Sequence, residues 1–522
     1  MHNQTQNHQH TLTPTSTLPA ASRWLVLAIV SVALLLIVVD MTVLYAALPR
    51  LTADLQASAS AKLWIVNIYA LIVSGLLLGM GTLGDRLGHK SLFIAGLIVF
   101  GIASLCAAYS PSSAALIASR ALLAVGAAMM MPATLSIIRL AFTDENERAV
   151  AIGIWASVAF GGAALGPVIG GLLLEYFWWG SVFLINVPIV LLALPIALFY
   201  IPKGAANKTR PWDLIGSLQI MAGLVGATYA LKEIGKREPA WGIAFLVLLI
   251  GVVFLALFAR RQQSSLHPMI DFSLFRNTIF SSSVAAAIIA GAALLGMELV
   301  FTQRLQLVLG MSPLQAGIFI LPLSLAAFVA GPLTGRVLPR LGSAYVLTLS
   351  LFVAGVGMAA YLFLHNAAIS IQLVCLIAIG AGIGAAMTAA SSTIMQSAPV
   401  DRAGMAASIE EVSYELGSVV GVTLMSSILS LAYASTLILP ADMNLPAIVW
   451  DSLDEALIVS QQLAPAAAQV IDVAAKASFD VAFTAVLAAA SLMLFLTSGI
   501  VWWTNRKGER ASTFASSAQA SH

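Results

Sequence analysis

The sequence predicts an all-α, polytopic membrane protein with fourteen membrane-spanning helices. Of its 522 residues, 60% are hydrophobic and only 9% are charged, whereas soluble domains have about 25% charged residues. The apolar residues also gather into runs long enough to cross a bilayer. A water-soluble fold could not cover its surface with so few charges. The net charge of +2 is small and dispersed, which argues against a nucleic-acid partner.

Residues 1–22 are polar and rich in Asn, Gln, Thr, Pro and His, so we expect a disordered tail. Its histidines His2, His8 and His10 could bind a metal weakly, but a solvated tail without a metal site is the preferred interpretation. A cleaved signal peptide is not expected, because the first apolar run continues past Asp40 and many similar runs follow it.

Fourteen apolar runs come after the tail. A spanning helix needs about 20 mostly apolar residues, because the hydrocarbon core is about 30 Å thick and each helical residue rises about 1.5 Å. The runs cover residues 24–48, 63–83, 91–109, 114–138, 149–174, 181–200, 214–231, 242–259, 280–306, 313–335, 344–363, 369–397, 404–433 and 480–502.

A repeated loop suggests that these runs form two bundles. The loop after the second run contains Gly81 to Arg86, and the loop after the tenth run contains Gly331 to Arg336. Duplicated bundles with a site at their interface are typical of secondary transporters. We therefore predict an N-terminal six-helix bundle, an inserted helix pair with linkers, a C-terminal six-helix bundle and a cytoplasmic tail, in residues 23–202, 203–279, 280–505 and 506–522.

Residues 434–479 are too polar, and too interrupted by Pro440, Pro446 and Pro465, to cross the bilayer. We expect an external loop, partly helical between Trp450 and Ala475.

The positive-inside rule orients the chain, because Lys and Arg are enriched in cytoplasmic loops. Of the 25 Lys and Arg residues, seventeen fall in the segments assigned to the cytoplasm, seven, including Arg304, fall in the external segments, and Arg120 lies within a span. This asymmetry favours an even number of spans with both termini in the cytoplasm.

Six charged residues lie inside the predicted spans: Asp40, Arg120, Glu298, Glu410, Glu411 and Glu415. At about 2.5–3.5 kcal/mol each, six unpaired charges would cost roughly 15–21 kcal/mol, which rivals the stability of a typical domain. Mutual pairing cannot neutralise them, because Arg120 is the only cation against five acids. Some acids must be protonated, solvated in a cavity or balanced by a cationic substrate.

The spacing of the acids adds detail. Glu411 and Glu415 are four residues apart and share one helix face, whereas Glu410 is turned about 100° away. Asp40 lies about 24 Å along its helix from Trp24, so we expect it in the outer half of the cavity. Two carboxylates on one face repel, and burial disfavours their charged form. The pair is therefore expected to carry protons.

Aromatic residues near these acids could hold a lipophilic cation against their ring faces. They are Tyr45, Trp155, Phe160, Phe301 and Tyr414. For any one of them, packing or an interface anchor is the more common role.

The fifth predicted span has a glycine-rich sequence. Its Gly162, Gly166, Gly170 and Gly171 permit close helix packing, and Pro167 suits this helix for bending.

Taken together, these motifs resemble the major facilitator superfamily, and its fourteen-segment drug:proton antiporter branch in particular. The segment from Gly81 to Lys90 matches the family's loop between spans two and three. The resemblance implies that this loop belongs to a cytoplasmic gate, whose residues are Gly81, Asp85, Arg86, Gly88 and Lys90.

Three further motifs carry the resemblance. Leu116 to Arg120 resembles the family's span-four motif, which implies a proton-coupling role for Arg120. The glycine-rich run matches the antiporter motif, and the segment Asp40 to Pro49 matches the span-one motif of the fourteen-segment branch. The resemblance covers nearly all the chain from Arg23 onward. It implies the major facilitator fold, with two six-helix bundles and two inserted helices.

Two departures from the branch pattern are informative. The common Trp-Arg-Trp pattern is missing around Gly180, so Trp178 and Trp179 cannot take its roles. Glu411 and Glu415 stand where many branch members have Asn and Gln. That acidic variant looks like the pumps for quaternary ammonium compounds and methyl viologen.

The resemblance and the charge pattern together predict a proton-coupled multidrug antiporter of the bacterial inner membrane, giving antiseptic resistance. It would export lipophilic organic cations such as quaternary ammonium antiseptics, dyes and methyl viologen. Proton coupling and cation binding are assigned to the six charged residues within the spans. The expected partners are the lipid bilayer, protons and cationic drugs, and the protein would act as a monomer without a cofactor.

Other functions are possible alternatives for such a sequence. A metabolite or siderophore exporter, or a proton symporter, could share the fold. An enzyme is disfavoured because the sequence contains no Ser/His/Asp set, metal-spaced His/Cys cluster or phosphate loop. A channel would need rings of like residues across subunits.

Overall fold

The computed structural model describes residues 19–57, 59–204, 213–234, 240–265, 268–311, 313–399, 402–440, 443, 445–450 and 452–519. These residues form helices and their connections, without a strand. Most of the predicted disordered tail, including its three histidines, lies outside the described residues. The first helix begins at Ala20, which is inside the predicted tail.

The helices before the inserted pair are α1 (Ala20–Asp54), α2 (Ala59–Leu87), α3 (His89–Ala108), α4 (Ser113–Ala141), α5 (Glu145–Tyr176), α6 (Ser181–Leu184) and α7 (Asn186–Tyr200). The inserted pair is α8 (Leu214–Ile234) and α9 (Trp241–Gln263), followed by η1 (Phe272–Arg276). The remaining elements are α10 (Thr278–Gln303), η2 (Arg304–Val308), α11 (Pro313–Leu341), α12 (Ser343–Leu364), α13 (Ile369–Ser397), α14 (Ala403–Thr436), η4 (Ala447–Trp450), α15 (Leu453–Ser460) and α16 (Pro465–Gln519).

Among the described residues, thirteen helical segments are long and apolar enough to cross a membrane. One combines α6 and α7, and another continues from α10 into η2. The 32-residue helix α5 has no charged residue between Arg148 and Glu175 and packs against α1 and α11 inside the bundle. With α5 counted, the structure has the predicted fourteen spans. Helices suit this setting because they satisfy their own backbone polar groups in lipid.

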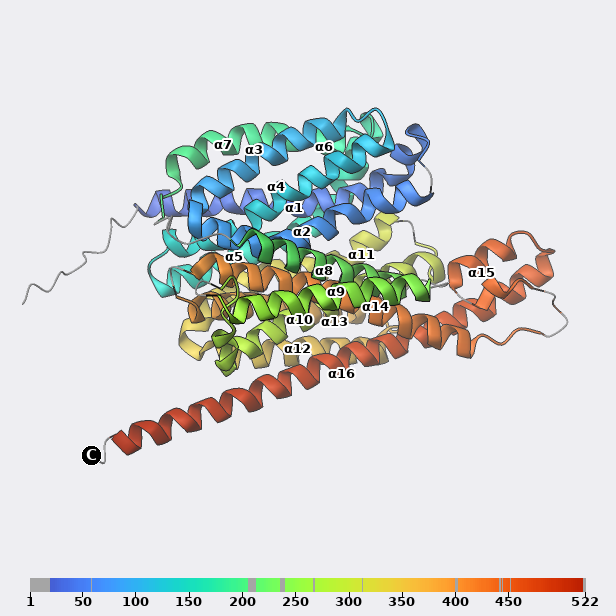
Figure 1. Cartoon of the computed structure of the whole chain (residues 1–522). Coiled ribbons are helices and arrows are strands. Elements are labelled where there is room, and N and C mark those ends of the chain that lie inside the picture. Colours follow the sequence, from blue (N-terminus) through green and yellow to red (C-terminus); the bar gives the residue numbers. More distant parts are fainter. Residues whose placement is uncertain are drawn as a thin grey trace, which may run out of the picture.

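The same packing pattern occurs twice along the chain. In the first half α1 packs on α5 and α3 on α4, and in the second half α10 packs on α14 and α12 on α13. The two halves meet where α2 crosses α14 and where α5 crosses α11. The inserted helices α8 and α9 run side by side on the near face of the bundle in Figure 1, and α8 contacts both α2 and α14.

The repeated loop is present, but its register differs from the prediction. α2 ends one residue before Gly88, and α3 begins one residue after it. α11 and α12 flank Gly342 in the same way. Their φ angles of 90° and 81° lie in the region that favours glycine. The segment equivalent to Gly81–Gly88 is therefore Gly335–Gly342, four residues later than the predicted match at Gly331.

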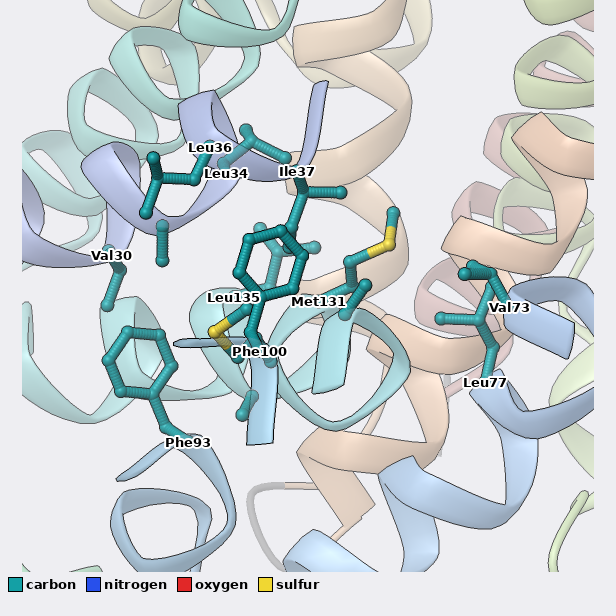
Figure 2. Packing of buried hydrophobic residues seen from close by; sticks show 14 of the residues in the cluster. Val30, Leu34, Leu36, Ile37, Val73, Leu77, Phe93, Phe100, Met131 and Leu135 are labelled. Atoms are coloured by element: carbon teal, nitrogen blue, oxygen red, sulfur yellow. The ribbon is translucent and has the colours of Figure 1, made fainter. Parts of the chain in front are cut away.

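The core of the first half is close-packed. Figure 2 shows Val30, Leu34 and Ile37 of α1 together with Phe93 and Phe100 of α3. Lipid is as apolar as these side chains, so van der Waals packing rather than water exclusion holds such helices together.

The predicted external loop has structure of its own. Tyr433 Oη, near the end of α14, donates to the Val449 carbonyl oxygen at 3.2 Å, and Ser460 Oγ at the end of α15 donates to Asp472 Oδ1 of α16 at 3.1 Å. α16 begins at Pro465, well before the predicted span. Proline is favoured in the first turn of a helix, so Pro465 can begin α16 although it was expected to interrupt it. In Figure 1, α15 lies at one end of the bundle, and the start of α1 and the end of α16 lie toward the other.

Candidate functional site

A cavity of about 250 Å³ lies between the two halves. Its walls come from α1, α4 and α5 on one side and from α10 to α14 on the other. Most of the lining is apolar, including Leu34, Met131, Leu294 and Met387. This position agrees with the expected site at a repeat interface.

Three of the predicted acids line the cavity: Glu298 of α10, and Glu411 and Glu415 of α14. In the part of the chain that the structure describes, no Lys or Arg joins them in the lining. The four-residue spacing therefore places Glu411 and Glu415 on the cavity face as predicted. Charged carboxylates in an apolar cavity are costly unless a proton or a bound cation neutralises them.

Glu410 lies behind the cavity wall. It is fully buried, and Ser391 Oγ of α13 donates to its Oε1 atom. Ser391 and Tyr414 do line the cavity, with 3.3 Å between Ser391 Oγ and Tyr414 Oη. Tyr414 Oη also donates to the Met387 carbonyl oxygen at 3.2 Å. The structure thus separates Glu410 from the two acids that follow it.

Asp40 lies inside the first bundle, and the prediction that it faces the cavity is wrong. It is 1% exposed, and its Oδ2 atom is 3.7 Å from Arg120 Nη1. Asn186 Nδ2 donates to Asp40 Oδ1 at 3.3 Å and lies 3.2 Å from Ser104 Oγ. The Arg120 guanidinium also lies 5.3 Å from the centre of the Tyr69 ring. Five helices of one bundle therefore enclose this buried charge pair.

The predicted aromatic contacts divide into two groups. Trp155, Phe301 and Tyr414 line the cavity. Trp155 is also held in place, because its Nε1 atom donates to Thr134 Oγ1 of α4 at 3.1 Å. The side chains of Tyr45 and Phe160 lie outside the described residues.

The glycine-rich run packs α5 against α1. A Cβ atom on Gly162 would approach Val38 to 3.1 Å, and one on Gly166 would collide with Thr42. Gly170 is buried, whereas a Cβ on Gly171 would meet nothing within 4 Å. The side chain of Pro167 lies outside the described residues.

The predicted gate residues lie where the two halves cross beyond the cavity. Asp85 of α2 accepts a hydrogen bond from the Gly404 backbone N–H in the first turn of α14 at 3.0 Å, and its Oδ1 atom is 3.2 Å from His89 Nε2. A carboxylate is favourable there because a helix N-terminus carries partial positive charge. Ser408 Oγ also donates to the Leu77 carbonyl oxygen at 2.8 Å. These contacts join the halves at this end.

Close backbone approach makes both crossings tight. A Cβ on Gly81 would collide with Gly404 of α14, and one on Gly335 would collide with Ala149 of α5. Gly88 forms the turn that follows α2.

The two basic gate residues lie beside these crossings. Lys90 Nζ donates to the carbonyl oxygens of Leu198 and Ile201 at 2.7 Å each. Arg86 is partly exposed in the last turn of α2. Neither residue takes part in the hydrogen bonds of Asp85 and Ser408 that join the halves.

The linker that follows the inserted pair is attached to this gate. Asp271 forms an ion pair with Arg402, which directly precedes α14, and the Asp271 backbone N–H lies 3.3 Å from Met405 Sδ. Hydrogen bonds from the side chain and backbone of Ser273, together with the nearby Arg402 guanidinium, hold the pKa of Asp271 below its ordinary value. Asp271 is therefore charged at neutral pH.

Sequence reasoning missed a second buried cation. Arg304 is 2% exposed, so the expectations that it lies in an external segment and that Arg120 is the only cation inside the spans are wrong. The signal was its position inside the predicted run 280–306. Asn186 and Ser391, which contact Asp40 and Glu410, were also missed, since each partner comes from a different helix.

The sequence matches the family model of the Major Facilitator Superfamily over residues 30–422. The chain belongs to the major facilitator superfamily. Two curated relatives match almost end to end. The methyl viologen resistance protein SmvA of Salmonella typhimurium is 38% identical over 491 residues, which cover 94% of this chain and 99% of that protein. The multidrug efflux pump LfrA of Mycolicibacterium smegmatis is 37% identical over 495 residues, covering 94% and 97%.

Solved structures agree on the fold. The human organic anion transporter TETRAN has a TM-score of 0.61 at 12% identity, covering 93% of this chain and 100% of that one. The proton:xylose symporter XylE has a TM-score of 0.59, also at 12% identity, covering 92% and 95%. This member of the superfamily is thus a multi-pass membrane transporter rather than an enzyme, and its relatives place it among drug efflux proteins.

Proposed function

We propose that this transporter exports lipophilic organic cations, including methyl viologen and quaternary ammonium compounds, in exchange for protons. The observation that carries the proposal is the composition of the cavity. Three carboxylates face an apolar space whose described lining contains no Lys or Arg. Such a site attracts a cation and accommodates its hydrocarbon part, whereas it repels an anion.

The size of the cavity favours small cations. Its volume of about 250 Å³ lies just below the usual range for ligand pockets, about 300–1,000 Å³. SmvA, named for methyl viologen resistance, and LfrA, named as a multidrug pump, support the same substrate class.

We assign the exchange to competition between protons and the drug cation for Glu298, Glu411 and Glu415. A protonated carboxyl group attracts a cation far less than a carboxylate does. Proton arrival from outside therefore favours drug release, and proton departure inside favours drug binding. The gate at Asp85 and Gly404 would close the cytoplasmic end while the cavity faces outward.

The buried pair of Asp40 and Arg120 would couple protonation to the movement of the bundles. Their 3.7 Å separation gives an attraction that protonation of Asp40 removes. Because α1 and α4, which carry the pair, also form walls of the cavity, a change in their packing would reach the cation site. This role is a positioning and coupling role, since Asp40 does not touch the cavity.

Energy balance sets a limit on the exchange. One proton exchanged for one monovalent cation moves no net charge, so only the pH gradient drives it, and one pH unit sustains about a tenfold cation gradient. Each additional proton would move one charge inward and add about 2.3 kcal/mol per 100 mV of membrane potential.

Transport in liposomes tests the proposal. An imposed proton gradient should drive the purified protein to move methyl viologen and ethidium in the direction opposite to the protons. An ionophore that collapses the gradient should stop this movement. Protein-free liposomes give the background. Transport that continues at the same rate after the gradient is collapsed would rule out proton exchange.

A further inference from the structure

A cluster of aromatic rings lies behind one wall of the cavity. It consists of Phe301 of α10, Tyr361 of α12 and Phe483 of α16. The centre of the Phe301 ring is 4.8 Å from that of Tyr361 and 5.4 Å from that of Phe483, with an interplanar angle of 88° in the second pair. Phe301 lines the cavity, whereas Tyr361 and Phe483 are fully buried behind it.

A buried arginine holds this cluster from the far side. The Arg304 guanidinium lies 5.0 Å from the centre of the Phe483 ring. Its Nε atom donates to Asp480 Oδ1 and its Nη2 atom donates to Asn366 Oδ1, both at 2.8 Å. Asp480 is three residues before Phe483 on α16, so these bonds fix the ring's helix as well as the guanidinium. The planar fork of arginine suits it to such combined pairing and stacking.

The backbone of α10 is unusual at the same place. Residues Arg304–Val308 form a π-helical turn, and such turns are rare and frequent at functional sites. The turn follows directly after the helix that carries Glu298 and Phe301, which are three residues apart and therefore share a face. Both residues line the cavity.

We propose that Glu298 and Phe301 form a subsite for the aromatic part of a cation, and that Arg304 is a positioning residue that holds the ring cluster in place. The proposal rests on the proposed function and narrows its substrate class to cations that carry flat aromatic rings. The cation's charge would face Glu298, while its ring would pack on Phe301. Aromatic pairs prefer offset or edge-to-face geometry, so a ring cluster of fixed orientation binds such a cation better than a mobile one.

The charge balance permits this arrangement. An unpaired arginine behind the wall would repel a cation in the cavity. Asp480 balances the charge of Arg304, so the aromatic wall is electrically neutral toward the cavity and Glu298 keeps its attraction. If Arg304 only stabilised the fold, its loss would weaken the binding of every substrate to the same extent.

The test compares an aromatic cation with an aliphatic one of the same charge. Binding of ethidium and of dodecyltrimethylammonium to the purified full-length protein should be measured by calorimetry for the wild type, Phe301→Leu, Arg304→Lys and the double variant. Phe352→Leu is the matched control, because Phe352 also pairs with a neighbouring ring, Phe495 at 5.5 Å, but is half exposed and outside the cavity lining.

Phe301→Leu should weaken ethidium binding about two- to tenfold and leave dodecyltrimethylammonium binding unchanged. Arg304→Lys should change the affinity ratio in the same direction, and the double variant should show less than the sum of the two effects. Phe352→Leu should change neither affinity. If Arg304→Lys does not fold, Phe301→Leu still decides the subsite.

An unchanged affinity ratio in Phe301→Leu would overturn the subsite, and equal weakening of both cations in Arg304→Lys would overturn the positioning role. If the wild type binds both cations but a proton gradient does not drive their transport in liposomes, only the proposed function is overturned. A wild type that binds neither cation would overturn both.

Discussion

The six charged residues predicted inside the spans have three different surroundings. Glu298, Glu411 and Glu415 line the cavity, Glu410 is buried against Ser391, and Asp40 and Arg120 form a pair within one bundle. Sequence spacing predicted that Glu411 and Glu415 share a face and that Glu410 does not, because these relations lie within one helix. It failed for Asp40, because the rise along a helix gives depth in the membrane but not the side of the helix that faces the cavity.

Neutral substitutions at the cavity acids should weaken cation binding. We expect Glu411→Gln and Glu415→Gln each to lower the affinity for tetraphenylphosphonium about tenfold, or about 1.4 kcal/mol. The loss for divalent methyl viologen should be about a hundredfold, since Coulomb energy is proportional to the substrate charge. The double variant should be non-additive because the two residues share one electrostatic site.

Glu410→Gln is the matched control for these variants. It neutralises a neighbouring carboxyl group on the same helix that lies behind the wall, so its effect on affinity should be much smaller. Binding is measured in detergent at several pH values. Equal losses in Glu410→Gln and Glu411→Gln would show that general electrostatics, rather than contact in the cavity, sets the affinity.

Asp40→Asn should abolish proton-driven export and retain cation binding. The substitution keeps a hydrogen-bonding group for Asn186 but removes the charge that Arg120 faces. Breaking a buried ion pair commonly costs about 3–5 kcal/mol, so equal amounts of folded protein must be reconstituted. Asp40→Glu, which restores the charge, should recover part of the transport. Export at the wild-type rate by Asp40→Asn would contradict a coupling role.

At the scale of helices, the sequence predicted all fourteen spans but not their pairing. Hydropathy reports that a helix crosses the membrane, whereas the α2–α14 and α5–α11 crossings depend on residues more than 130 positions apart in the sequence. The register of the repeated loop could not be fixed from Gly-Arg spacing alone, because the deciding feature is the positive φ angle at Gly88 and Gly342.

Gly404→Ala should hinder closure of the gate. An added Cβ would lie 2.8 Å from both Asp85 Oδ1 and His89 Cε1, and such overpacking typically costs about 1–3 kcal/mol. The thermal midpoint of the purified protein should fall, and proton-driven export should slow. Gly499→Ala is the control, because nothing lies within 4 Å of its added Cβ. If both variants behave alike, the close crossing has no part in transport.

At the scale of the whole molecule, two bundles with one repeated packing pattern enclose a cavity that draws residues from both. The pattern is not symmetric in its charges. Asp85 caps α14 at one crossing, whereas Pro339 occupies the equivalent place at the other. The first crossing therefore has a carboxylate at this position and the second does not. The inserted pair contacts the first crossing through α8, and the linker after the pair contacts it through the ion pair of Asp271 with Arg402.

The orientation of the whole chain gives the last prediction. The start of α1 and the end of α16 lie toward the same end of the bundle (Figure 1), so we predict that both termini lie on one side of the membrane. The excess of Lys and Arg in one set of loops favours the cytoplasm as that side. Alkaline phosphatase, which is active only outside the inner membrane, should be inactive when fused after His522 and active when inserted after Gln462, between α15 and α16. A fluorescent protein that folds only in the cytoplasm should give the opposite pattern. Phosphatase activity after His522 would reverse the orientation, and with it the assignment of the Asp85–Gly404 crossing to the cytoplasmic gate.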